Sequence, residues 1–231
     1  MDMRRILVLN SKGGCGKTTI ATTLASRYAC DGFNTSLIDY DPQGSSMRWL
    51  AQRSKNRPAI NGVDAHRNLT MNVTSTWALR VPPTTDRIVI DAPAGVMGHQ
   101  VFEYLRQIDT IIIPVLPSHI DIHATARFIE DLLLIGKVRQ LGVNVGVVAN
   151  RAKKNTTIYT ALQRFLATLK LPFITTLRDT QHYVRAAGSG IGIHEMWDPR
   201  ARVDQADWEV LYDWLENRTT AVNTRYAQGS G

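Results

Sequence analysis

Residues 9–19 read Leu-Asn-Ser-Lys-Gly-Gly-Cys-Gly-Lys-Thr-Thr and directly follow a short apolar run that begins after Arg5. A glycine-rich loop that closes with Gly-Lys-Thr, between a strand and a helix, wraps backbone N–H groups around phosphate oxygens. The stretch therefore predicts a strand, a phosphate-binding turn and a helix that begins at Lys17. This order of elements is the first unit of an α/β fold.

The rest of the chain continues the alternation of short β-branched runs and helical patterns. Several runs are apolar at consecutive positions, which is typical of strands covered on both faces. The predicted strands are Arg5–Leu9, Thr35–Asp39, Arg87–Asp91, Thr110–Val115, Asn144–Ala149 and Phe173–Thr176. The predicted helices are Lys17–Asp31, Ser45–Arg53, Ile122–Leu141, Thr156–Leu169, Thr180–Ala187 and Arg202–Asn217. The pattern predicts an α/β fold with a doubly wound, mostly parallel sheet flanked by helices.

One domain over residues 1–218, with a flexible tail over 219–231, is the simplest division of the 231-residue chain. The least regular region is Ser54–Asp86, which contains several prolines and glycines. We expect loops there, with one edge strand near Asn68–Val73.

The composition favours a water-soluble protein with a polyanionic partner. A hydrophobic fraction of 44% argues against disorder, and the net charge of +7 favours nucleic acid or acidic lipid. The two cysteines, Cys15 and Cys30, form no disulfide framework or metal-ligand set, so we expect the reducing cytoplasm. No apolar stretch approaches the roughly 18 residues of a membrane span.

The loop residues suit ATP and Mg²⁺ as ligands. The glycines let the backbone turn tightly around phosphate oxygens. We expect the Lys17 ammonium to reach the β- and γ-phosphates and the Thr18 hydroxyl to bind Mg²⁺. The residues expected to contact the nucleotide are Gly13, Gly14, Cys15, Gly16, Lys17, Thr18 and Thr19.

Aspartates follow two of the predicted strands, at the sheet edge where ligands bind in parallel α/β folds. Asp39 and Asp41 are two residues apart, so in an extended segment they project to the same side. Asp91 ends an apolar strand, as the aspartate that binds Mg²⁺ through water does in phosphate-loop proteins. For Asp41, which precedes Pro42, a purely structural role in a turn or helix cap remains an alternative.

The second lysine of the loop, Lys12, makes the stretch resemble the deviant Walker A motif of the ParA/MinD family. In that family the matching lysine crosses a dimer interface and contacts the partner's nucleotide. The resemblance therefore implies a homodimer in the ATP state, with Lys12 and Lys17 as catalytic residues. A cation supplied in this way offsets charge that develops on the transferred phosphoryl group.

Two further segments resemble the switch motifs of the same family: Asp-Tyr-Asp-Pro-Gln-Gly from Asp39 and Asp-Ala-Pro-Ala-Gly from Asp91. The match implies that Asp41 positions the attacking water and that Asp39 supports the metal site. It also implies that the Gly95 N–H approaches the γ-phosphate. Asn150, in the segment Val-Val-Ala-Asn-Arg that begins at Val147, matches the family residue that contacts adenine at a strand end.

The positive charge is concentrated in residues 151–185, which carry seven basic side chains and one acid. A patch of this kind neutralises DNA phosphates without reading sequence, although a merely solvated basic face is the alternative. The candidate DNA contacts are Arg151, Lys153, Lys154, Arg164, Lys170 and Arg185.

The last predicted helix bears on the choice between DNA and membrane. Its apolar stripe consists of Trp208, Leu211, Trp214 and Leu215 and is flanked by acids. Membrane-surface helices are usually basic on the polar face, so we expect this stripe to pack onto the sheet.

The resemblance implies a nucleoid-associated ATPase that positions cargo such as a plasmid, a chromosome or a carboxysome. In the family, a small cargo-bound adaptor stimulates hydrolysis. A membrane-cycling regulator and a metabolic enzyme of the same family remain the alternatives.

Overall fold

A computed structural model describes residues 3–65, 81–95, 105, 107–134, 138, 140–168 and 171–216. Seven strands in these residues form one sheet in the order β3-β2-β4-β1-β5-β6-β7, and every neighbouring pair runs parallel. The predicted doubly wound α/β fold is therefore confirmed. Residues 217–231, which include the whole of the predicted tail, lie outside the described part.

The strands are β1 (Arg4–Val8), β2 (Thr35–Asp39), β3 (Ile60–Asp64), β4 (Arg87–Asp91), β5 (Thr110–Val115), β6 (Asn144–Ala152) and β7 (Phe173–Arg178). The helices are α1 (Lys17–Cys30), α2 (Ser45–Gln52), α4 (His119–Leu134), α5 (Thr157–Thr168), α6 (Gln181–Gly188) and α7 (Arg202–Leu215). Two 3₁₀ turns, η2 (Ile193–Glu195) and η3 (Pro199–Ala201), precede α7.

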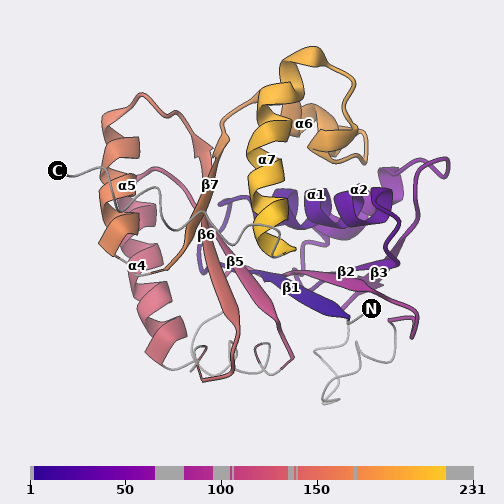
Figure 1. Ribbon diagram of the computed structural model, residues 1–231, viewed down its shortest axis with the longest axis horizontal. Coiled ribbons are helices and arrows are strands. Elements are labelled where there is room, and N and C mark those ends of the chain that lie inside the picture. The colour runs from indigo at the N-terminus through magenta and orange to yellow at the C-terminus, as the bar shows by residue number, and fades with distance from the viewer. Residues whose placement is uncertain are drawn as a thin grey trace.

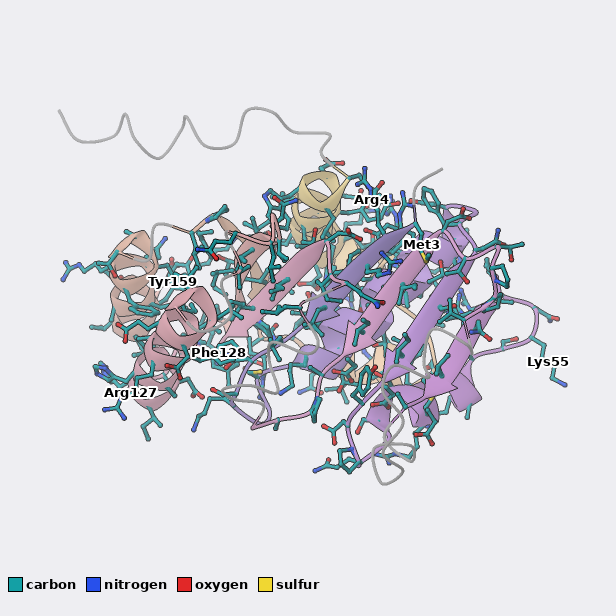
Figure 2. All side chains as sticks on the ribbon, turned by 90° about the horizontal axis from the view of Figure 1, so that it is seen from below. Met3, Arg4, Lys55, Arg127, Phe128 and Tyr159 are labelled. Atoms are coloured by element: carbon teal, nitrogen blue, oxygen red, sulfur yellow. The ribbon has the colours of Figure 1, made fainter. Side chains whose placement is uncertain are left out.

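Helices cover both faces of the sheet, as Figure 1 shows: α1, α2 and α7 lie on one face, and α4 and α5 on the other. Strand β1 serves both layers because successive side chains point to opposite faces. Ile6 packs with the α1 layer and Leu7 with the α4 layer. Figure 2 labels Phe128 of α4, which is buried in the second layer, beside Arg127, which projects into solvent.

The α7 stripe packs on the sheet, as the sequence predicts. Trp208, Leu211 and Leu215 are buried in the same core as α1, and Trp214 is packed against that core. The start of β1 is close to the end of this helix, where Arg4 donates to the Leu215 carbonyl at 2.9 Å (Figure 2). Within the described residues, no helix has the length and apolar character that crossing a membrane requires.

Strand β3 is the element that the sequence analysis missed, because it lies inside the region assigned to loops. Asn61 and Gly62 are poor strand formers, which hides the element from propensity. The glycine allows α2 to pack closely, since a Cβ at Gly62 would lie 2.4 Å from a Leu50 methyl carbon and would force that side chain to move. The strand predicted near Asn68–Val73 lies outside the described residues.

The boundaries of α4 were also predicted wrongly, as Ile122–Leu141. The helix begins at His119 because the Ser118 hydroxyl accepts the Asp121 N–H at 3.1 Å and caps the first turn. It ends well before Leu141, and residues 140–142 form a turn in which Gly142 has φ 70°. The predicted strands Thr35–Asp39, Arg87–Asp91 and Thr110–Val115 match the structure at both ends, and the other predicted elements differ from it by at most three residues at an end.

Candidate nucleotide-binding site

The phosphate loop lies at the middle of the sheet, between β1 and α1. From β1 the chain leads first to β2 and β3 on one side and later to β5, β6 and β7 on the other. The carboxyl ends of the strands at such a switch point border the crevice in which α/β proteins bind ligands. The residues that the sequence analysis selected for the nucleotide gather at this edge.

The loop turns into α1 through Gly16, whose φ of 94° lies in the left-handed region. The N-cap of α1, Gly16, supplies no side-chain cap, and Thr18 and Thr19 occupy the first turn. The N–H groups of a helix start without a side-chain cap are available to an anion. Gly16 also permits a close approach, because a Cβ there would lie 2.0 Å from the Asn150 side-chain nitrogen.

Lys17 is buried inside the loop, with 6% of its surface exposed. Its ammonium donates to the Asn10 carbonyl at 3.2 Å and to the Lys12 carbonyl at 3.0 Å. Two of its three N–H groups therefore hold the loop in shape, while the charge is at the position where phosphates are cradled. The Lys12 side chain itself is partly exposed at the outer edge.

Asn10 is a site residue that the sequence analysis missed. Its side-chain nitrogen donates to the Pro114 carbonyl of β5 at 2.6 Å and to the Thr125 hydroxyl of α4 at 3.3 Å. Its side-chain oxygen accepts the Lys12 N–H at 3.2 Å. A polar residue at the end of an apolar strand was the available signal, since buried amides need partners. Asn10 ties the loop to the next strand and its helix.

Three aspartates end neighbouring strands in register. Asp39 of β2 pairs with Asp91 of β4 on one side and with Asp64 of β3 on the other. The sequence pattern predicts the first two at strand ends, but it does not indicate Asp64 because β3 is not apparent in it. The Asp91 Oδ2 atom accepts hydroxyl hydrogen bonds from Thr18 and from Ser46, both at 2.8 Å.

Asp91 fits the role of a metal-site carboxylate. Its second oxygen, Oδ1, is buried and has no hydrogen-bond partner among the described residues. Burial raises the pKa of Asp91 to about 7, and the nearby Asp39 charge adds to this, while the Thr18 and Ser46 hydroxyls oppose it. Mg²⁺ prefers oxygen ligands and keeps several waters, so the Thr18 hydroxyl and the unused Asp91 oxygen suit it.

Asp39 organises the backbone at the start of α2. Its carboxylate accepts the N–H groups of Asp41 at 3.0 Å, Ser46 at 2.9 Å and Met47 at 3.1 Å. The helix has Gly44 at its N-cap, so Asp39 supplies the cap that a glycine lacks. Burial raises the pKa of Asp39. Ser46 donates its N–H to Asp39 and its hydroxyl to Asp91. Asp39 therefore helps to hold the Ser46 hydroxyl in place beside Asp91.

Asp41 forms a turn in the described geometry, since its carboxylate accepts the Gln43 N–H at 2.9 Å. That bond matches the structural alternative, and the predicted role in orienting water stays a prediction. Gly95, with φ 78°, donates its N–H to the Ser11 carbonyl at 2.9 Å. It therefore joins the segment after β4 to the phosphate loop, and an approach to the γ-phosphate would require this bond to open.

Asn150 lies against the phosphate loop, where its side-chain nitrogen donates to the Cys15 carbonyl at 2.8 Å. It therefore supports the loop from the end of β6, and the adenine contact implied by the family resemblance stays a prediction. Cys15 is buried, and burial raises the pKa of its thiol, which is then protonated and unreactive at neutral pH.

The basic candidates are partly paired with acids. Three ion pairs join Arg151 to Asp179 at 3.5 Å, Lys154 to Asp207 at 3.6 Å and Arg185 to Asp198 at 3.6 Å. Lys153 and Arg164 are exposed, and Arg164 lines an open groove of about 530 Å³ beside α5, together with Lys154. Lys170 lies outside the described residues.

Comparison with curated proteins gives two relatives that span most of the chain. Maintenance of carboxysome distribution protein A of Halothiobacillus neapolitanus is 29% identical over 198 residues, 83% of this chain and 87% of that protein. The protein of the same name from Gloeobacter kilaueensis is 27% identical over 215 residues, 92% of this chain and 94% of that protein.

Solved structures share the fold. An ATP complex of Cyanothece McdA superposes with a TM-score of 0.71 at 16% identity, over 91% of this chain and 96% of that one. The MinD cell division protein of Aquifex aeolicus gives a TM-score of 0.69 at 18% identity, over 92% and 97%.

A family model described as the CobQ/CobB/MinD/ParA nucleotide binding domain matches residues 6–193. This range includes the phosphate loop, the three aspartates that end β2, β3 and β4, and Asn150. The chain therefore belongs to the CobQ/CobB/MinD/ParA family of nucleotide-binding domains.

Proposed function

We propose that this protein hydrolyses ATP as a homodimer, binds DNA without sequence preference in its ATP state, and positions a cellular cargo. The cargo is of the plasmid, chromosome or carboxysome class, and a cargo-bound adaptor stimulates hydrolysis. The observation that carries the proposal is Lys12, a second lysine at the exposed edge of a phosphate loop in a nucleotide-binding domain. The two relatives named for carboxysome distribution support the cargo class.

Different residues of the site have different roles in hydrolysis. Lys17 places a fixed positive charge at the base of the loop, where it offsets the charge that develops on the phosphates. The Thr18 hydroxyl and the unused Asp91 oxygen would hold Mg²⁺, which would supply further positive charge to the phosphates. Asp41, in the loop between β2 and α2, orients the attacking water. Lys12 reaches the nucleotide of the partner protomer, so the reaction requires a dimer.

A chain of hydrogen bonds makes the β2–α2 loop sensitive to the metal site. The Ser46 hydroxyl binds Asp91, and the Ser46 N–H binds Asp39. The same Asp39 carboxylate holds the Asp41 N–H. A shift at Asp91 therefore moves the start of α2 and the segment that carries Asp41, which is how a nucleotide state can alter a dimer surface.

The surface properties favour DNA over a membrane as the anionic partner. Two basic residues are exposed near α5: Lys153 lies before the helix and Arg164 lies on it. The apolar stripe of α7 is buried against the sheet, so a membrane could bind it only after α7 leaves the core. DNA binding through phosphate neutralisation weakens steeply as salt is added.

Lys12→Ala tests the proposal. We expect the wild type to form a dimer and to shift random-sequence DNA with ATP but not with ADP. The Lys12→Ala protein should bind a fluorescent ATP analogue within a few-fold of the wild type, yet remain a monomer and leave DNA unshifted. Light scattering coupled to size-exclusion chromatography and a gel shift measure these outcomes.

The matched control is Lys55→Ala, because Lys55 is exposed and projects from the molecule in a loop away from the phosphate loop (Figure 2). It should behave as the wild type does. If the Lys12→Ala protein dimerised normally, or if the wild type bound DNA equally well with ADP, the proposed switch would be wrong.

A further inference from the structure

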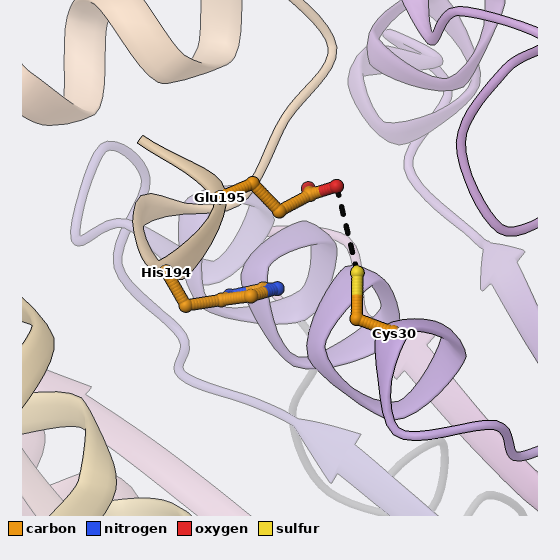
Figure 3. Close-up of side chains that lie close together, drawn as sticks. All are labelled: Cys30, His194 and Glu195. Atoms are coloured by element: carbon orange, nitrogen blue, oxygen red, sulfur yellow. Dashed lines mark hydrogen bonds between the residues drawn. The ribbon is translucent and has the colours of Figure 1, made fainter. Parts of the chain in front are cut away.

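Three side chains that the nucleotide site does not use meet where the end of α1 faces η2. Cys30 is the last residue of α1, and His194 and Glu195 belong to η2. Figure 3 shows the His194 imidazole directed toward the Cys30 thiol, with the Glu195 carboxylate beside both. One potential ligand atom from each residue, a sulfur, a nitrogen and an oxygen, lies within 4.8 Å of the other two.

One nitrogen of His194 lacks a partner within the part of the chain that the structure describes. Its Nε2 atom is buried and makes no hydrogen bond with the described residues, although buried polar atoms are nearly always paired. Burial lowers the pKa of His194 to about 4, so the imidazole is neutral at physiological pH. A neutral imidazole nitrogen is the form that binds metals.

Glu195 is held as a carboxylate. Burial alone would raise its pKa, but hydrogen bonds from Arg53 and from the Gly192 N–H lower it below its usual value. Arg53 donates to both oxygens at 2.9 and 3.0 Å, and Arg57 donates to Oε1 at 2.8 Å. Oε1 is also the oxygen closest to the Cys30 sulfur, at 3.5 Å.

The two arginines differ in how freely they can move. The Arg53 side chain is 4% exposed and is fixed between α2 and η2. The Arg57 side chain is 33% exposed, so it can swing into solvent and leave Oε1 with the bond from Arg53 alone among the two arginines. Arg57 is therefore the more easily displaced competitor of an ion at this position.

The three side chains border a groove at the surface, and the η2 turn that carries two of them is held in place by α7. Cys30, His194 and Glu195 all line an open groove of about 460 Å³. The side chain of Gln205, from α7, donates to the Ile193 and Met196 carbonyls at 3.1 and 3.0 Å and fixes the turn between them. An ion in the groove can reach Cys30 and Glu195, and a local movement of the imidazole would expose the buried His194 Nε2 to it.

We propose that Cys30, His194 and Glu195 bind a Zn²⁺ ion, with water as the fourth ligand. Thiolate, imidazole and carboxylate are the donors that Zn²⁺ takes in tetrahedral sites. Bond lengths of about 2.0–2.3 Å place such ligands roughly 3.5 Å apart, so the cluster contracts by about 1 Å. Binding replaces the thiol proton of Cys30, which leaves to the solvent.

The ion links parts of the fold that are distant in sequence. It joins the end of α1 to η2, and Glu195 extends the link to α2 through Arg53. Because the unfolded chain lacks the site, binding stabilises the folded protein. The inference does not rest on the proposed function and concerns a different part of the molecule.

The test uses the full-length, metal-free protein titrated with Co²⁺, which reports thiolate ligation by a near-ultraviolet charge-transfer band and tetrahedral geometry by visible bands. We expect one Co²⁺ per chain, displaced by Zn²⁺. Cys30→Ser should lose the charge-transfer band, while Cys15→Ser should keep it. His194→Gln should weaken Co²⁺ binding at least tenfold, and Arg57→Gln should strengthen it several-fold because a competing cation is removed.

A second measurement guards against misfolding of the variants. Zn²⁺ should raise the melting temperature of the wild type and of Cys15→Ser, and should leave that of Cys30→Ser unchanged. No charge-transfer band in the wild type, or an unchanged band in Cys30→Ser, would overturn the proposed site. If Arg57→Gln weakened Co²⁺ binding, Arg57 would not compete with the ion for Glu195, and Glu195 would not be the proposed ligand.

Discussion

Asp91 combines burial, two hydroxyl partners and an oxygen without a partner. Its pKa of about 7 in the folded protein exceeds the value near 3.9 of an unfolded chain. Between these values the folded state binds more protons, so the free energy of unfolding falls as pH rises through this window. The burial of this carboxylate thus lowers the stability of the metal-free protein above neutral pH.

Asp91→Asn should therefore stabilise the metal-free protein while it removes activity. At pH 8 the gain in the free energy of unfolding is expected to reach at most about 4 kcal/mol, and it should vanish near pH 4. Urea unfolding in EDTA at several pH values measures the gain. ATP hydrolysis should fall at least 100-fold, because the amide is a poor ligand for Mg²⁺. A variant less stable than the wild type at pH 8 would contradict the assigned cause.

Asp41 is the residue for which the turn and the catalytic role must be separated. Asp41→Ala removes both the turn bond to Gln43 and the carboxylate, whereas Asp41→Asn keeps an oxygen that can accept the same N–H. If the carboxylate orients water, both variants should bind ATP, accumulate as dimers and hydrolyse ATP at least tenfold more slowly, as single-turnover assays would show. If Asp41→Asn hydrolysed ATP at the wild-type rate, the carboxylate would not orient the water, and Asp41 would have only its role in the turn.

At the scale of elements, α7 is held to the sheet by a buried ion pair. Arg87 of β4 donates to Glu216 at 2.9 Å, and their side chains are 6% and 8% exposed. The Arg87 guanidinium also stacks on Phe33, 4.0 Å from the ring centre. Leaving one buried charge without its partner is costly, whereas an exposed pair contributes little.

Glu216→Gln should lower the free energy of unfolding by about 2–4 kcal/mol, because Arg87 stays buried without an opposite charge. The matched control is Glu209→Gln, since Glu209 pairs with Arg27 but its side chain is 46% exposed. That change should cost less than about 1 kcal/mol. Urea unfolding of both proteins tests the comparison, and equal losses would show that burial of the Arg87 pair does not govern the attachment of α7.

At the scale of the whole molecule, tertiary contacts redistribute the charge. Residues 151–185 carry a large positive excess along the sequence. In space, acids from the segment before α7 and from α7 itself approach them, and Asp207 lies 3.6 Å from Lys154. The positive charge that this region presents is therefore lower than the sequence count suggests.

Asp207→Asn should raise the affinity for random-sequence DNA about two- to five-fold in the ATP state at low salt, because it frees Lys154 for a phosphate. Fluorescence anisotropy at two salt concentrations measures the change and its salt dependence. Asp213→Asn is the control, since it removes the same charge from another side of α7. Equal effects of the two changes would show that net charge, and not the Lys154 pair, controls the affinity.

The sequence by itself determined the features that local chemistry controls. The glycines and lysines of residues 11–19 fix the loop, because the Lys17 bonds to Asn10 and Lys12 join residues close in the chain. Apolar runs identified six strands, since burial on both faces leaves a continuous pattern. The pattern also placed Asp39 and Asp91 at strand ends, which was enough to expect a metal site.

Only the tertiary structure decided the features that depend on distant segments. β3 forms because β2 offers it a partner and α2 covers Gly62, neither of which the propensity of Asn61 and Gly62 reveals. In the same way, Asn10 is tied to Thr125, and Cys30 meets His194, across long stretches of chain. The pattern of side chains specifies the backbone conformation over a few residues, whereas contacts between distant residues depend on how whole elements pack.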